Sequence, residues 1–94
     1  MKSSTREMSI EEFKDYIINE FPSPKVRRYI RETLKLLISD PFKYAREKLG
    51  WDIYGNRMFS IEVTGDIRIL YSVDLENYVV FIWEVGSHKR VYGR

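Results

Sequence analysis

Cysteine is absent from this chain of 94 residues, and histidine occurs once, as His88. Without cysteine the chain can form neither a disulfide framework nor a thiolate metal site. One histidine among scattered acidic residues makes no cluster of metal ligands, so we expect no metal. The five glycines form no phosphate-cradling loop, and we therefore expect no nucleotide or other cofactor.

Long apolar runs are also missing. No segment approaches the roughly 20 apolar residues that a membrane-spanning helix needs, and the polar start from Met1 to Glu7 lacks the apolar core of a signal peptide. These absences predict a soluble, cytoplasmic protein without a membrane partner. The length suits a single domain over residues 1–94, and 44% apolar residues are enough for a core.

The net charge of +2 is small, but the charge is unevenly distributed. Residues 1–23 carry a net −2, residues 24–50 a net +5, and residues 51–94 a net −1. A basic middle segment is typical of proteins that contact a polyanion. A solvated helix face accounts for the same pattern equally well.

The first half of the chain has helical signals. Ser9 and the glutamate three residues later form a capping box, which predicts a helix to about Asn19. Ser23 followed by Pro24 predicts the start of a second helix. Because the break between them is short, we expect an antiparallel helix pair. Asp40-Pro41 repeats the same device and predicts a short turn of helix that ends at Leu49.

From Arg57 the apolar period changes to two, which indicates strands. The pattern predicts strands over about 58–64, 67–74 and 78–85, joined by tight turns. The last run is apolar on both sides, so it should be central or covered on both faces. We predict an α+β domain in which the helix pair packs on a three-stranded, possibly four-stranded, antiparallel sheet. The expected core residues are Leu34, Leu37, Ile61, Ile69, Phe81 and Trp83.

Four motifs follow one another in a characteristic order. Asp40-Pro41 precedes Lys48-Leu49-Gly50; then come Gly65-Asp66-Ile67-Arg68-Ile69-Leu70-Tyr71 and the closing Val85-Gly86-Ser87-His88-Lys89-Arg90-Val91-Tyr92. Over about residues 9–92 the chain resembles the RelE/ParE superfamily, the toxins of type II toxin–antitoxin pairs. The resemblance implies a RelE-like fold and an endoribonuclease that cuts mRNA, usually on the ribosome. It also implies a cognate antitoxin as partner.

The resemblance assigns roles by position. Arg68 matches the arginine that holds the scissile phosphate, and His88 matches an acid/base histidine. Tyr92 matches an aromatic residue that stacks on a base or joins proton transfer, and Lys89 or Arg90 matches further phosphate-binding residues. We assign RNA binding to a wider basic set as well. Its members are Lys89, Arg90, Arg57, Arg46 and Lys48.

RNA cleavage by side chains needs a base, a cation for the phosphorane charge and an acid. Histidine suits both proton roles because its unperturbed pKa is ~6.5. Arginine donates to two phosphate oxygens at once. Each residue also has an ordinary alternative: His88 as a surface residue, Arg68 in an ion pair with Glu62 or Asp66, and Tyr92 packed on the sheet edge. Trp51 and Trp83 are expected in the core rather than on RNA.

Three departures from the family pattern keep other functions open. Only eight residues precede Ser9, so a leading strand should be short or missing. The second predicted strand carries Glu62 and no basic residue beyond Arg57, and Glu84 stands where some relatives have arginine. The alternatives are a ParE-like toxin that poisons gyrase and an inactive member that only binds RNA or a partner. In each case an acidic, amphipathic antitoxin segment is the expected protein ligand.

Overall fold

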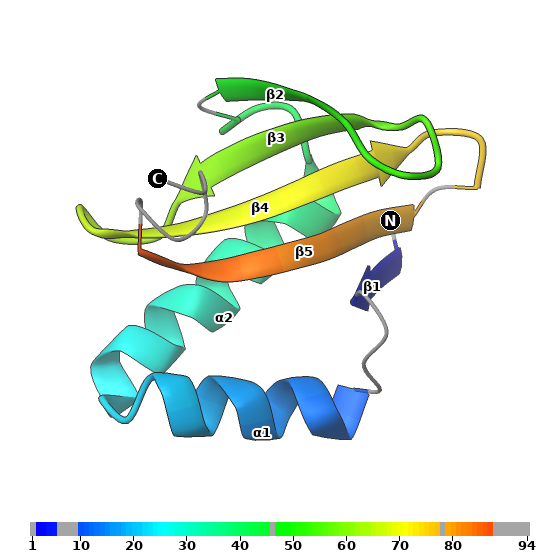
Figure 1. Ribbon diagram of the computed structural model, residues 1–94. Helices are drawn as coiled ribbons and strands as arrows, with labels where there is room; N and C mark the ends of the chain where they lie inside the picture. Colours follow the sequence, from blue (N-terminus) through cyan, green and yellow to red (C-terminus); the bar gives the residue numbers. More distant parts are fainter. Residues whose placement is uncertain (1, 6–9, 46, 78, 88–94) are drawn as a thin grey trace.

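The computed structural model describes residues 2–5, 10–45, 47–77 and 79–87. Within these residues the chain forms a pair of helices that covers one face of a twisted sheet (Figure 1). The sheet has the strand order β1-β5-β4-β3-β2. The elements are β1 (Lys2–Thr5), α1 (Ile10–Glu20), α2 (Pro24–Ser39), β2 (Glu47–Trp51), β3 (Arg57–Glu62), β4 (Ile67–Asp74) and β5 (Val79–Ser87).

Helix α2 begins as the sequence predicts. Ser23 is its N-cap, and the Ser23 hydroxyl accepts a hydrogen bond from the Val26 N–H at 3.4 Å. Pro24 occupies the first turn, where its missing N–H leaves no carbonyl unpaired. The predicted cap of α1, Ser9, lies outside the described residues, and α1 itself covers Ile10–Glu20.

The predicted short helix from Asp40 to Leu49 is wrong. Asp40 does accept hydrogen bonds from the N–H groups of Phe42 and Lys43, but residues 41–44 form only a turn. The chain then enters β2, which pairs antiparallel with β3. The backbone N–H and carbonyl groups of β2 find hydrogen-bond partners on the edge of β3. This long-range pairing outweighs the weak local signal for a helix.

The predicted α+β class is confirmed: two helices pack on an antiparallel sheet formed by β2, β3, β4 and β5. Strand β5 lies inside the sheet, between β4 and β1, as its two-sided apolar pattern predicts. The leading strand β1 is short, at four residues, and pairs parallel with β5. Its polar residues carry no period that would have revealed this pairing.

The core lies between the helices and the sheet. Ile30 and Leu37 of α2 and Ile69 and Val80 of the sheet are nearly inaccessible to solvent. Tyr71 is also buried there, and its hydroxyl donates to the Pro41 carbonyl. Burial raises the pKa of Tyr71 well above its ordinary value, with a smaller contribution from the charge of Asp40.

Two of the six predicted core residues lie elsewhere. Leu37, Ile61 and Ile69 are buried as predicted, and Leu34 is partly buried against them. Phe81 and Trp83 alternate with the buried residues of β5, so they project from the other side of the sheet, where they are half-buried. We call that side the outer face. It carries Glu62, Arg68, Leu70, Ser72, Phe81 and Trp83.

Candidate functional site

The β3–β4 turn, residues 63–67, is closed by its own backbone and by one threonine. The Val63 N–H donates to the Ile67 carbonyl at 2.8 Å. The Thr64 hydroxyl accepts from the N–H groups of Asp66 and Ile67 at 3.3 and 3.2 Å. This turn fixes the register that sets Arg68 directly opposite Glu62.

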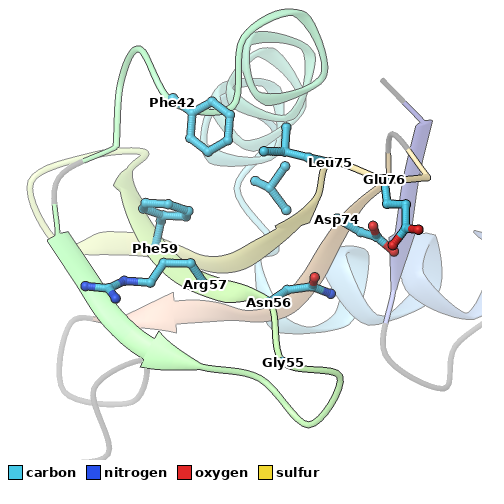
Figure 2. Close-up of a pocket in the computed structure, with 9 residues that line it drawn as sticks. Phe42, Gly55, Asn56, Arg57, Phe59, Asp74, Leu75 and Glu76 are labelled. Carbon is cyan, nitrogen blue, oxygen red and sulfur yellow. The ribbon is translucent and has the colours of Figure 1, made fainter.

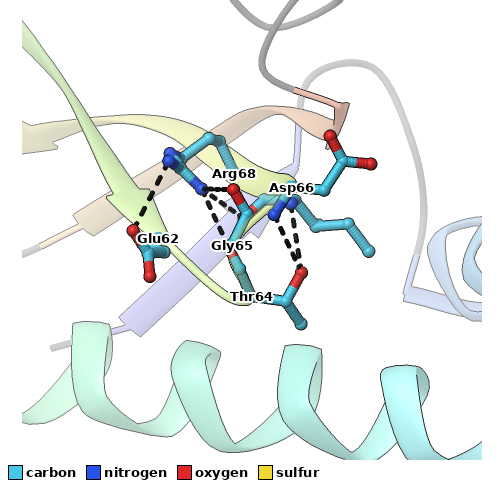
Figure 3. A network of polar contacts seen from close by, with 6 residues as sticks. Glu62, Thr64, Gly65, Asp66 and Arg68 are labelled. Atoms are coloured by element: carbon cyan, nitrogen blue, oxygen red, sulfur yellow. Dashed lines mark hydrogen bonds and ion pairs between the residues drawn. The ribbon is translucent and has the colours of Figure 1, made fainter.

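Arg68 folds back over this turn (Figure 3). One terminal guanidinium nitrogen lies 2.8 Å from the Thr64 carbonyl and 3.3 Å from the carbonyls of Gly65 and Ile67. The other terminal nitrogen forms an ion pair with a Glu62 carboxylate oxygen at 3.4 Å. The Arg68 side chain is only 13% exposed. The predicted structural partner Glu62 is therefore the acid that Arg68 contacts.

The register of β4 and β5 places Arg68 beside the start of the closing motif. Arg68 pairs with Gly86, and Ile67 pairs with Ser87. The motif continues with His88, Lys89, Arg90 and Tyr92, which lie outside the described residues. The described strands thus place Arg68 at the end of the sheet where β5 ends at Ser87, the residue before His88 in the sequence.

The other predicted RNA-binding residues do not join Arg68. Arg46 is outside the described residues. Lys48 pairs with Phe59, and Arg57 lies two residues before Phe59, so both lie on the helix side of the sheet. Arg57 is also five residues from Glu62 along β3, or about 17 Å. Arg57 and Arg68 therefore lie on opposite faces and at opposite ends of the sheet.

Arg57 instead borders a hollow of about 310 Å³ on the helix side (Figure 2). Phe42 and Phe59 form part of its apolar wall, and their rings meet edge to face at 5.6 Å. The carboxylates of Asp74 and Glu76 lie on another part of its rim. The Arg57 guanidinium also lies 4.8 Å from the centre of the Trp51 ring.

A chain of polar contacts on the outer face was not predicted. The indole N–H of Trp83 donates to the Ser72 hydroxyl at 2.8 Å, and that hydroxyl donates to Asp52 at 2.6 Å. Asp52 also accepts from the backbone N–H groups of Tyr54 and Asn56 at 2.8 and 2.9 Å. The sequence signal was available, because Asp52 begins a turn and Ser72 interrupts an apolar strand.

Asp52 is held in its ionised form by these contacts. Burial alone would raise the pKa of Asp52, but the hydrogen bonds from Ser72 and from the Asn56 and Tyr54 backbone outweigh it. The net result is a pKa below the ordinary value. The carboxylate therefore fastens the β2–β3 loop to the middle of the sheet.

The fastened loop and the last residue of β2 present apolar side chains to solvent. Ile53 is 81% exposed, and Trp51 and Tyr54 are each 64% exposed. The Tyr54 ring lies 5.5 Å from the ring of Phe81 and 6.1 Å from that of Trp83. Trp51, which we expected in the core, thus lies at the surface.

Residues 2–5, 10–45, 47–77 and 79–87 contain no cluster of three or more histidine, cysteine or acidic side chains suited to a metal ion. Neither described helix is long and apolar enough to cross a membrane.

Solved structures of several toxins share this fold. A YoeB/ParE toxin from Agrobacterium tumefaciens superposes with a TM-score of 0.66 at 16% identity, covering 94% of this chain and 99% of that one. A metal-bound toxin from Helicobacter pylori superposes with a TM-score of 0.60 at 16% sequence identity, covering 97% of this chain and 98% of that one. A YoeB dimer from Staphylococcus aureus superposes with a TM-score of 0.60 at 20% sequence identity, covering 94% of this chain and 97% of that one. At these identities the likeness establishes the fold of such toxins.

The sequence establishes the family. A family model described as the ParE toxin of the type II toxin–antitoxin system parDE matches residues 7–92, nearly the whole chain. The chain belongs to this family, within the RelE/ParE superfamily. Its partner is accordingly a cognate antitoxin. No sequence among curated proteins matches the chain.

Proposed function

We propose that this toxin is an endoribonuclease that cleaves mRNA on the ribosome and so inhibits translation. The observation that carries the proposal is the pairing of Arg68, whose side chain is only 13% exposed, with Gly86, two residues before His88 in the sequence. Cleavage needs a phosphate-binding cation and a proton-transfer group at one place. This pairing supports such a site on the outer face, at the end of the sheet where β4 begins and β5 ends.

The proposed chemistry divides the roles between Arg68 and the closing motif. A base removes the proton of an RNA 2′-hydroxyl, and the resulting oxygen attacks the adjacent phosphate. The Arg68 guanidinium stabilises the charge on the phosphorane, and an acid returns a proton to the leaving 5′-oxygen. His88 serves in proton transfer, with Tyr92 and Lys89 or Arg90 as supports. Arg68 must release the Glu62 carboxylate to receive the phosphate.

A second function has its own support. Among the described residues of β3, β4 and β5, Arg68 is the one cation on the outer face, and turn carbonyls and Glu62 already engage it. The matching family model is named for ParE. Both facts favour a toxin that binds a protein target such as gyrase without cleaving RNA.

Two parallel assays separate the functions. Purified toxin is added to a translating extract, and primer extension maps new 5′ ends on the mRNA. The same preparation is added to a gyrase supercoiling reaction. New mRNA ends with normal supercoiling support the first proposal. Blocked supercoiling with intact mRNA would transfer the assignment to the gyrase function.

A further inference from the structure

Helix α2 carries a line of cations on its solvent side. Lys25, Arg28, Arg31 and Lys35 are all exposed and recur at helical spacing, and we call them the α2 ridge. At 1.5 Å per residue the ridge extends for about 15 Å. The opposite side of α2 carries Ile30 and Leu37 into the core, so the ridge points away from the sheet and from Arg68.

The charges of the ridge are not neutralised locally. Glu32 is the one acidic residue of α2, and it is exposed among five basic residues. Within the described part of the chain, no ridge residue has an acidic group within ion-pair distance. Instead, Lys25 and Arg28 both lie against the ring of Tyr29, at 6.0 and 5.9 Å from its centre. The aromatic face brings two like charges together.

The positions of these charges do not stabilise the helix. The first turn of α2 has no acidic residue and the last turn has no basic one, whereas Lys25 and Arg28 lie near the N-terminus. The positive end of the helix dipole disfavours cations in the first turn, where Lys25 lies. Helix stability therefore does not account for the ridge.

We propose that the α2 ridge binds the phosphate backbone of a nucleic-acid duplex, on the helix side of the molecule, away from the outer face that carries Arg68. Phosphates suit it because two of the four cations are arginines, whose forked donors match phosphate oxygens. A protein partner suits it less, because the ridge has no apolar side chain, while interface cores are depleted in charge. The exposed Leu36 is rotated by about 100° around the helix axis from its neighbour Lys35, so it is not a member of the ridge.

The test measures binding without cleavage. Fluorescence anisotropy gives the affinity of the purified protein for a duplex of about 20 base pairs, made once as RNA and once as DNA, between about 50 and 200 mM salt. Each ridge cation that contacts a phosphate should contribute about 0.9 to the slope of log K against log salt on B-DNA. The RNA and DNA arms identify the natural source of the phosphates.

The ridge variant carries Lys25→Gln, Arg28→Gln, Arg31→Gln and Lys35→Gln. Glutamine has a helix propensity close to that of lysine and arginine, and removing cations near the N-terminus relieves the dipole. The variant should therefore melt no lower than the wild type, while its affinity falls at least 100-fold and its salt slope flattens. Lys43→Gln, which removes an exposed cation outside the ridge, should lose less than threefold.

An unchanged affinity and slope in the ridge variant would overturn the proposal. The proposal would also be overturned if the loss of affinity per removed charge were the same in the ridge variant as in Lys43→Gln. Because both arms score binding alone, these outcomes are independent of whether the toxin cleaves mRNA.

Discussion

Arg68 already forms hydrogen bonds and an ion pair within the folded chain. Its terminal nitrogens contact three turn carbonyls and Glu62, so it stabilises the β3–β4 turn as well as carrying the proposed phosphate site. Arg68→Ala should therefore lower the free energy of unfolding by about 1.5–3 kcal/mol, the range for hydrogen bonds from charged groups. Urea denaturation measures this loss. A stability equal to that of the wild type would show that these contacts contribute nothing.

Glu62 competes with substrate for Arg68 in the proposed mechanism. Glu62→Gln keeps the size of the side chain and removes its charge, so cleavage should become faster by up to about fivefold, the equivalent of an exposed ion pair. Glu76→Gln, at an exposed position remote from Arg68, is the matched control and should leave the rate unchanged. Slower cleavage by Glu62→Gln would indicate that Glu62 assists the site instead.

Asp52 gives stability a pH dependence with a defined sign. Its pKa is lower in the folded chain than the ordinary ~3.9, so its stabilising contribution is complete above about pH 4 and is lost as the pH falls through the folded pKa. Asp52→Asn should be less stable than the wild type near neutral pH, and the difference should narrow below about pH 4. Denaturation curves across this range test it. The exposed Asp15→Asn serves as control, and a constant difference for Asp52→Asn would contradict the account.

At the scale of elements, β2 shows how local backbone geometry directs the chain. Gly50 has φ +91°, and the β2–β3 register shifts between Lys48 and Trp51. Gly50→Ala should cost about 1–2 kcal/mol because a side chain disfavours this left-handed conformation. Gly65→Ala is the control: that glycine has open space around it and no positive φ. Equal stability of both variants, measured by thermal unfolding, would remove the assigned role of Gly50.

The elements divide into those with strong local signals and those without. Residues 24–39 combine a serine cap, a proline and a helical apolar stripe, and residues 57–74 alternate around a glycine turn, so these elements were predicted correctly. Strands β1 and β2 are edge strands whose pairing is long-range, and no local pattern marks them. Phe81 and Trp83 were placed in the core because apolarity alone does not tell which face of a central strand a residue takes.

The candidate site was predicted in part for a similar reason. The motif around Arg68 located the turn, and the Glu62 contact followed from the alternation of the strand. Arg57 and Lys48 were grouped with Arg68 by charge, but strand parity places them on the other face. Asp52 at a turn and Ser72 within an apolar strand each stand out in the sequence, but sequence spacing does not show that they meet each other and Trp83.

At the scale of the whole molecule, the two layers give the toxin two distinct sides. The outer face presents Arg68 and the β2–β3 loop with Tyr54, whereas the helix side presents the α2 ridge. Under the two proposals, the outer face would meet mRNA while the helix side meets a nucleic-acid duplex. If the toxin cleaves mRNA through Arg68 as proposed, we expect the cognate antitoxin to neutralise it by covering or distorting the outer face.

Cleavage of mRNA by the closing motif is the central claim, and the rate of His88→Ala tests it most directly. Primer extension on translating ribosomes gives the rate of new 5′ ends for the wild type and the variant at equal concentrations. The account predicts cleavage by the wild type and a loss of about 10²–10⁴-fold in His88→Ala, the usual contribution of a positioned acid or base. Wild-type rates in His88→Ala, or no cleavage by the wild type itself, would contradict it.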